Sequence, residues 1–205
     1  MTTITHNSTV TTGAQQTCIT ITPPLNPGDA TSRLPIDTVL VIDTSYSMKD
    51  EVSTVTETGG TVSDGLSILD LVKHAAKTNV RSLTKNDILS VVAYSTEGSV
   101  IVHRMMCSDD NKVAIIAAID GLREDGHTNI WGGLHKALET VYEDEKRDEL
   151  YRHKSILLLT DGRPNINPPR GVVGMLKKYN EDRRTWCLDS DIVSINTFGF
   201  GYNLD

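Results

Sequence analysis

The chain has few of the features that mark disulfide scaffolds, nucleic-acid binders and membrane proteins. Its 205 residues include three cysteines, Cys18, Cys107 and Cys187, which are too few and too scattered for a disulfide framework. Their odd number favours a reducing compartment, and no two of them have the spacing of metal ligands. Aromatic residues make up only 5% of the sequence, and none alternates with basic residues as base-stacking platforms do.

Basic surfaces and long apolar runs are also missing. The formal net charge is −7 and the pI is about 5.3, whereas nucleic acids and anionic membranes attract basic patches. No apolar run approaches the roughly 20 residues that span a bilayer. Residues 1–16 lack the basic start and the apolar stretch of a secretory signal. The sequence therefore predicts a soluble cytoplasmic protein that binds neither nucleic acid nor membranes.

Composition divides the chain into three regions. Residues 1–16 are predicted to be disordered, and Thr17–Thr22 alternates polar with apolar residues, as a half-buried strand does. A linker rich in proline and glycine continues to residue 35. In residues 36–205, apolar runs alternate with helical stripes without a break, which indicates one α/β domain large enough to bury a sizeable core.

The predicted domain is an open, mostly parallel sheet flanked by helices. We expect strands at Asp37–Asp43, Asp87–Ser95, Gly98–Met106, Ile156–Leu159 and Asp191–Phe200, and helices at Ser67–Leu83, Asn111–Leu122, Asn129–Glu143 and from the proline-rich loop to Arg183. The short turn before Gly98–Met106 makes that strand antiparallel to the preceding one, and the predicted spatial order is 3-2-1-4-5. Ser67 and Asp70 predict a capping box, whereas the polar segment Lys49–Asp64 predicts a long surface loop.

The residues that follow the first core strand carry the strongest functional signal. The apolar run that ends at Ile42 is followed at once by Asp43, Ser45 and Ser47, which offer one carboxylate and two hydroxyls on alternate residues. Open α/β sheets bind ligands at the carboxyl ends of their strands. An all-oxygen cluster suits a hard cation such as Mg²⁺, and the lack of His and Cys argues against zinc. Taken alone, these residues also fit an ordinary polar turn.

Two later segments strengthen the metal hypothesis. Thr128 stands at the start of a predicted helix, and Asp161 directly follows another buried strand. Together with Asp43, Ser45 and Ser47, these two residues resemble the metal-ion-dependent adhesion site of von Willebrand factor type A domains. The resemblance extends from about Ile36 to the last residue, in the family's order. It implies a Rossmann-like α/β/α fold with three layers, and a bound Mg²⁺ or Mn²⁺ ion held by these five residues.

The chain departs from the family pattern in two places. Many members carry a small residue where this chain has Tyr46, which alters the rim of the site and not the ligand set. Type A domains also close with one further helix and strand, which we expect to be missing here. The strand Asp191–Phe200 would then be an exposed edge through which the protein can associate.

A narrower resemblance concerns the parent protein. Residues 64–70, 164–171 and 197–202 are similar to a eukaryotic subgroup in which the type A domain occurs with a Hint module or with RING or U-box ubiquitin-ligase modules. In that subgroup a strand before the domain belongs to a flanking β-module, as Thr17–Thr22 would here. No Hint, RING or U-box module is visible in this sequence, so ligase or processing activity is not carried over.

The resemblance implies a protein-interaction module and no enzyme. An Asp or Glu of a partner would complete the coordination of the ion, and Lys49–Asp64, His127 and Arg163–Arg170 would rim it. Asp43 is expected to be a surface ligand whose loss spares the fold. No G-x-S-x-G, P-loop or H-E-x-x-H motif occurs.

Two alternatives stay open. One is a Mg²⁺-dependent phosphatase or phosphotransferase that uses Asp43 as its nucleophile and Lys49 or Arg163 to hold the phosphoryl group. The other is a structural domain with a vestigial metal site.

Overall fold

The computed structural model describes residues 7–12, 17–22, 33–55, 61–143, 152–162, 164–184 and 193–201. The chain divides into two compact units, residues 1–34 and 35–205. In the smaller unit, strands β1 (Asn7–Thr12) and β2 (Thr17–Thr22) form an antiparallel hairpin in which Asn7 lies opposite Thr22. Strand β2 was predicted. Strand β1 was not, since it lies within residues 1–16, for which disorder was expected. A threonine-rich strand shows little hydrophobic periodicity by itself, so the pattern gave no signal for it.

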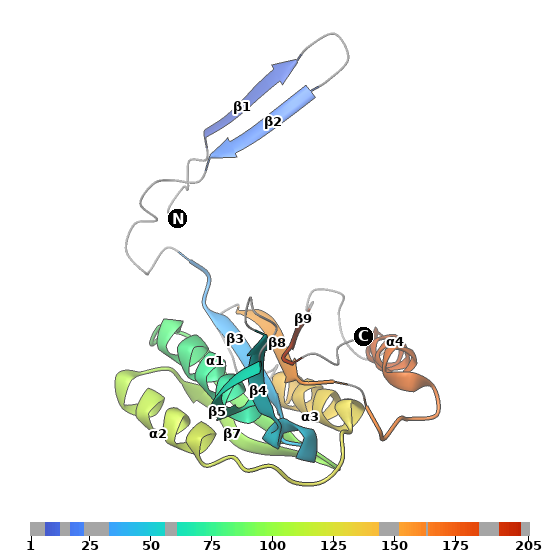
Figure 1. Ribbon diagram of the computed structural model, residues 1–205. Coiled ribbons are helices and arrows are strands. Elements are labelled where there is room, and N and C mark those ends of the chain that lie inside the picture. Colours follow the sequence, from blue (N-terminus) through green and yellow to red (C-terminus); the bar gives the residue numbers. More distant parts are fainter. Residues whose placement is uncertain are drawn as a thin grey trace. The chain divides into compact units, whose positions relative to one another are not determined.

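The larger unit is built on a sheet of five strands (Figure 1). These strands are β3 (Ile36–Asp43), β6 (Ile88–Tyr94), β7 (Gly98–Met106), β8 (His153–Thr160) and β9 (Val193–Gly199). Their order is β7-β6-β3-β8-β9, and only β7 runs antiparallel to its neighbour. The predicted order 3-2-1-4-5 is therefore confirmed.

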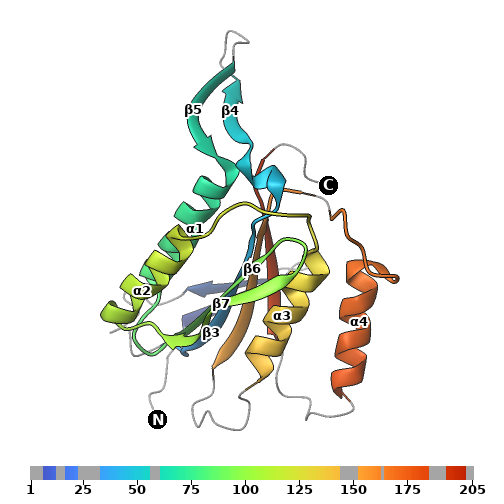
Figure 2. The same ribbon diagram turned by 90° about the horizontal axis from the view of Figure 1, so that it is seen from below.

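Helices cover both faces of this sheet (Figure 2). Helices α1 (Ile68–Ser82) and α2 (Asp109–Asp120) pack on one face, and α3 (Ile130–Tyr142) and α4 (Gly171–Arg184) pack on the other. The central strand β3 is buried along almost its whole length, with Leu40 facing α1 and Val41 facing α3. Burial on both faces explains why its sequence is a continuous apolar run.

The starts of the helices follow from local capping. Ser67 and Asp70 form the predicted capping box at α1, in which the Ser67 hydroxyl accepts from the Asp70 N–H and the Asp70 carboxylate accepts from the Ser67 N–H. Helix α2 begins two residues before the predicted Asn111, because Ser108 accepts a hydrogen bond from the Asn111 N–H. Most of the charged run after α3, residues 144–151, lies outside the described residues.

The prediction of a long surface loop at Lys49–Asp64 is wrong. A 3₁₀ helix, η1 (Tyr46–Lys49), is followed by an antiparallel hairpin of β4 (Glu51–Val55) and β5 (Thr61–Ser67). The hairpin projects away from the sheet in Figure 2, and β5 leads directly into α1. Valine and threonine on both sides of a Gly-Gly pair favour such a hairpin. The polar composition of the segment concealed this pattern.

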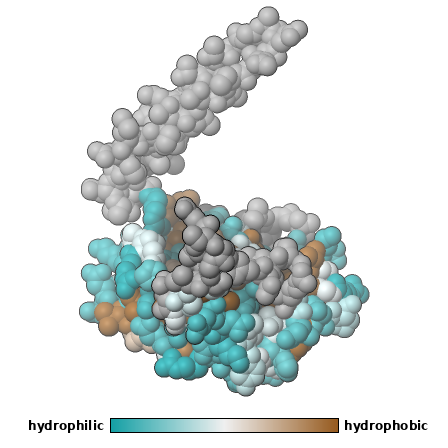
Figure 3. All heavy atoms as spheres, in the orientation of Figure 1, coloured by the Kyte–Doolittle hydropathy of each residue, from teal (hydrophilic) through white to brown (hydrophobic). Residues whose placement is uncertain are grey.

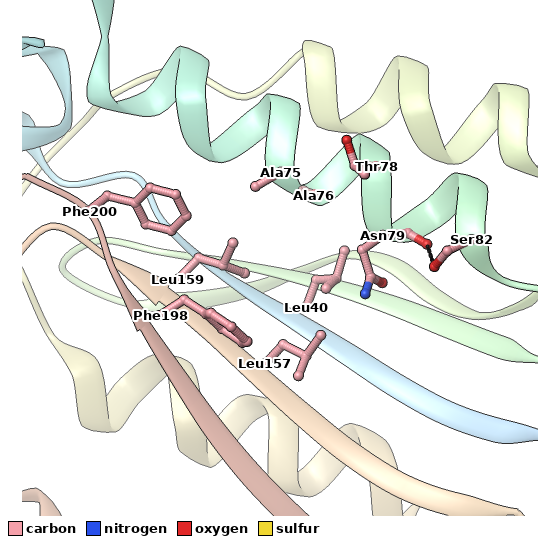
Figure 4. Close-up of a pocket in the computed structure, with 10 residues that line it drawn as sticks. All are labelled: Leu40, Ala75, Ala76, Thr78, Asn79, Ser82, Leu157, Leu159, Phe198 and Phe200. Atoms are coloured by element: carbon pink, nitrogen blue, oxygen red, sulfur yellow. Dashed lines mark hydrogen bonds between the residues drawn. The ribbon is translucent and has the colours of Figure 1, made fainter. Parts of the chain in front are cut away.

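Strand β9 borders an apolar groove in the larger unit (Figure 4). A cavity of about 340 Å³ lies between α1 and β9, with Leu157, Leu159 and Phe198 on the sheet side and the small residues of α1 opposite. Phe198 is 49% exposed. Among the described strands, β9 pairs only with β8, so association through this edge stays a prediction.

The face seen in Figure 3 is mostly hydrophilic, with small separate hydrophobic patches. None of the helices in the described residues has the length and apolar character that crossing a membrane requires.

A buried ion pair supports the amino end of β3. Asp37 on β3 is 1% exposed and pairs with Arg104 on β7. Burial raises the pKa of the Asp37 carboxyl, and the charge of Arg104 opposes this shift. Arg104 has a φ of 40°, and the register of β7 against β6 shifts nearby. The bulge at Arg104 therefore lies at the residue whose guanidinium pairs with Asp37.

Replacing Arg104 with Met should lower the free energy of unfolding by about 3 kcal/mol, because a buried carboxylate would lose its cation. Adding Asp37→Asn to this variant should recover part of the loss, since the amide carries no charge. Urea denaturation followed by circular dichroism measures both effects. A double variant no more stable than Arg104→Met would contradict this electrostatic account.

Candidate metal centre

The five predicted ligands come from three segments at the carboxyl edge of the sheet. Asp43 is the last residue of β3, and Ser45 and Ser47 lie in the turn and the 3₁₀ helix that follow it. Asp161 directly follows β8, the parallel neighbour of β3, and Thr128 stands two residues before α3. Because β3 and β8 run in the same direction, their carboxyl ends meet at one edge.

Asp43 is held by three hydrogen bonds. Its Oδ1 accepts from the Ser45 N–H at 2.9 Å, and its Oδ2 accepts from the Tyr94 hydroxyl at 2.9 Å and the Thr160 hydroxyl at 2.7 Å. The side chain has no accessible surface. Asp43 is therefore not the surface ligand that the sequence suggested. Its removal would leave two buried hydroxyls and one N–H without their acceptor, which destabilises a fold.

Ser47 links the first ligand segment to the third. The Ser45 and Ser47 hydroxyls lie 3.2 Å apart, and the Ser47 side chain lies close enough to Asp161 to act on the pKa of its carboxyl. Burial raises the pKa of Asp161, the Ser47 hydroxyl opposes this rise, and the charge of Asp43 adds to it. Asp43, Ser45, Ser47 and Asp161 are therefore brought together, and the two carboxylates repel each other.

The backbone around Thr128 is tied to both other segments. The Asp125 N–H donates to the Thr44 carbonyl at 2.7 Å, and the Tyr46 N–H donates to the Gly126 carbonyl at 3.2 Å. Asn165, in the loop after β8, accepts from the Thr128 N–H at 2.8 Å and donates its own N–H to the Thr128 carbonyl at 3.1 Å. Thr128 is 5% exposed. Among the described residues, no hydrogen bond joins the Thr128 hydroxyl to the other four predicted ligands.

Three supporting residues were not predicted from the sequence: Tyr94, Thr160 and Asn165. Tyr94 and Thr160 are the last residues of the strands on either side of β3. A polar residue at the end of an apolar strand was therefore the signal by which these two could have been predicted. Burial raises the pKa of the Tyr94 hydroxyl well above 10, and the charge of Asp43 adds to the shift. Tyr94 therefore stays protonated and remains a donor.

The close approach of α3 fixes the Tyr94 ring. A Cβ atom on Gly133 would lie 2.7 Å from that ring, which is closer than carbon atoms pack. The helix therefore needs glycine at this position, opposite Tyr94.

The donor set fits a hard divalent cation. It consists of two carboxylates and three hydroxyls, and oxygen ligands are those that Mg²⁺ binds in proteins. Within the described ranges, no group of three or more His, Cys, Asp and Glu side chains could hold a metal ion. His127 is exposed, and its backbone N–H donates to the Thr96 hydroxyl. A cation would also relieve the repulsion between Asp43 and Asp161.

Replacing Tyr94 with Phe should lower the free energy of unfolding by about 1 kcal/mol, because Asp43 loses one of its three donors. The ring itself would keep its packing against α3. Urea denaturation measures the change, and Tyr46→Phe is the matched control, since Tyr46 is 56% exposed. Equal losses in the two variants would show that the hydroxyl of Tyr94 has no special role.

The von Willebrand factor type A domain family has a sequence model that matches residues 38–163. The chain belongs to this family.

Two curated relatives match most of the chain. The uncharacterized protein YfbK of Escherichia coli strain K12 is 30% identical over 165 residues, which are 80% of this chain and 24% of that protein. The uncharacterized protein sll0103 of a Synechocystis strain is 32% identical over 134 residues, 65% of this chain and 27% of that protein. The chain thus spans about a quarter of the length of these relatives.

Solved structures share the fold. A von Willebrand factor type A protein from Catenulispora acidiphila aligns with a TM-score of 0.62 and 17% identity, over 92% of this chain and 36% of that one. Proximal thread matrix protein 1 from the mussel byssus, with a zinc-occupied MIDAS motif, aligns with a TM-score of 0.56 and 22% identity, over 83% and 37% of the two chains. An aerotolerance-related membrane protein from Bacteroides fragilis aligns with a TM-score of 0.55 and 14% identity, over 81% and 68%.

Proposed function

We propose that this domain is a metal-dependent protein-interaction module. It binds the carboxylate of an Asp or Glu on a partner through a Mg²⁺ ion, and Mn²⁺ can take its place. The residues that would hold the ion are Asp43, Ser45, Ser47, Thr128 and Asp161. Support for a metal at this edge comes from the mussel byssus protein of the same fold, which is described with a zinc-occupied MIDAS motif.

The hydrogen bonds of Asp43 carry the proposal. A carboxylate has about four lone-pair positions, and Asp43 already uses three of them within the protein. It therefore offers little negative charge directly to the ion and acts at most through one lone pair or a water molecule. The neutral hydroxyls of Ser45, Ser47 and Thr128 would supply much of the coordination. An ion held in this way keeps its attraction for a carboxylate from outside.

The enzyme alternative fits the geometry poorly. A nucleophilic aspartate needs a free oxygen that a phosphoryl group can reach, whereas Asp43 has no accessible surface and both of its oxygens accept hydrogen bonds. We therefore propose that the domain binds and does not catalyse. The association with Hint, RING or U-box modules and the cytoplasmic location stay predictions.

Asp161→Asn tests the ion site through the melting temperature, measured once without metal and once with added Mg²⁺. Without metal, the variant should melt at a higher temperature than the wild type near neutral pH, because its amide no longer repels Asp43. The sign follows from the raised pKa of Asp161, since a carboxyl whose pKa is raised by folding destabilises the fold when it is ionised. With added Mg²⁺, the melting temperature of the wild type should rise and that of the variant should not.

Asp110→Asn is the control for this test, because Asp110 is exposed on α2. It should not raise the melting temperature, because the charge of Asp110 lies in the first turn of α2 and favours the helix, and it should leave the rise caused by Mg²⁺ intact. A wild-type protein that stays folded but shows no heat of binding with millimolar Mg²⁺ or Mn²⁺ in calorimetry would disprove the ion site.

Binding of a partner can be tested with a bead-bound peptide library in which one position is Asp, Asn or Ala. The labelled domain should be retained on the Asp beads in Mg²⁺ and released by a chelator, and added metal should restore retention. Asn and Ala beads should not retain it, because they offer no anionic ligand. Retention that survives chelation would rule out the metal bridge.

A further inference from the structure

Both backbone groups of Thr128 are held by the loop that follows β8. The Thr128 N–H donates to the side-chain oxygen of Asn165 at 2.8 Å. The Thr128 carbonyl accepts from the N–H groups of Asn165 and Ile166, at 3.1 and 3.2 Å. Asp161, another predicted ligand, stands shortly before Asn165 in the same segment. One short stretch of chain therefore carries one predicted ligand and fixes the backbone of a second.

The residues on either side of Thr128 are held by a different part of the structure. The N–H groups of His127 and Asn129 donate to the turn between β6 and β7, at 3.1 and 2.8 Å. Loss of the Asn165 side chain would therefore loosen Thr128 without releasing the whole loop. Asn165 is itself exposed, so its replacement leaves no cavity in the core.

The loop that presents Asn165 is braced. Pro164 stands directly before Asn165, and two further prolines follow Asn167. Each proline ring fixes the φ angle of its residue. The side-chain amide of Asn167 donates to the Pro164 carbonyl at 3.3 Å. Asn165 therefore holds Thr128 from a segment whose own backbone has little freedom.

The position of the Thr128 hydroxyl depends on this backbone. Thr128 is 5% exposed, and the branched threonine side chain has few χ1 conformations, so its hydroxyl moves with the main chain. The hydroxyls of Ser45 and Ser47 lie 3.2 Å apart and support each other. Thr128 comes from another segment, and Asn165 supplies the side chain that keeps its main chain in place.

Mg²⁺ and Ca²⁺ make different demands on such a ligand. Mg²⁺ requires a nearly ideal octahedron of oxygens at about 2.0–2.1 Å, whereas Ca²⁺ accepts roughly six to eight oxygens at about 2.3–2.6 Å in flexible arrangements. A ligand without a fixed position therefore weakens the binding of Mg²⁺ more than that of Ca²⁺.

We infer that Asn165 is a positioning residue that raises the affinity of the proposed ion site for Mg²⁺ relative to Ca²⁺. It acts through the backbone of Thr128 and not as a ligand. The inference rests on the proposed function only in needing the ion site, and it does not depend on which partner binds there. It assigns part of the choice of metal to a residue outside the predicted ligand set.

Calorimetric titrations of the wild type and of Asn165→Ala with Mg²⁺ and with Ca²⁺ test the inference. The affinity of the variant for Mg²⁺ should fall about tenfold, which is a usual effect of removing a residue that orients a metal ligand. Its affinity for Ca²⁺ should fall less. Without metal, its melting temperature should fall by no more than about 4 °C, because one hydrogen bond is lost from an exposed side chain.

Two matched variants assign the effect to the hydrogen bond. Asn167→Ala makes the same change in the same loop, at a side chain that contacts Pro164 and not Thr128, and it should leave both affinities unchanged. Asn165→Asp keeps an acceptor for the Thr128 N–H. Its added charge attracts both divalent ions, so the ratio of the two affinities should stay close to that of the wild type.

The outcomes separate this inference from the proposed function. If Asn165→Ala binds Mg²⁺ as tightly as the wild type does, or loses affinity for both ions equally, the inference is wrong and the ion site stands. An equal effect of Asn167→Ala would also overturn it, as would a ratio for Asn165→Asp as low as that for Asn165→Ala. If the wild type binds neither ion, the inference fails together with the proposed function.

Discussion

The hydrogen bonding of one buried carboxylate, Asp43, organises the carboxyl edge of this domain. Its three donors come from the turn after β3 and from the strands on both sides of β3. A buried charge without such partners would cost several kcal/mol. The fold can therefore tolerate Asp43 only while β6, β3 and β8 keep their register. The geometry of the proposed ion site and the pairing of the central strands are thus parts of one constraint.

The same constraint supports the proposal that the site binds a partner and does not catalyse a reaction. A carboxylate whose lone pairs are mostly occupied by internal donors is a fixed negative charge, and it is a poor nucleophile and a weak direct ligand. The hydroxyls around it are neutral. In the proposed site, a cation in such surroundings would stay attractive to an anion from outside.

Relatives of this domain are longer proteins, since the chain spans about a quarter of the curated ones. Two features of the larger unit have no part in the proposed ion site. One such feature is the hairpin of β4 and β5, which begins at the residue after Asp50. Another is the apolar groove along β9, which lies on the α1 face of the sheet.

The sequence by itself determined the order of the strands, because continuous apolar runs, helical stripes and one short turn are local patterns. It also determined the cap of α1, whose partners Ser67 and Asp70 are three residues apart. Only the tertiary structure decided that Asp43 is buried, since its donors Tyr94 and Thr160 are 51 and 117 residues away. Local periodicity says that a strand ends in a polar residue, but not which hydroxyl of a neighbouring strand will face it. That choice depends on the register between strands, which only packing of the whole sheet sets.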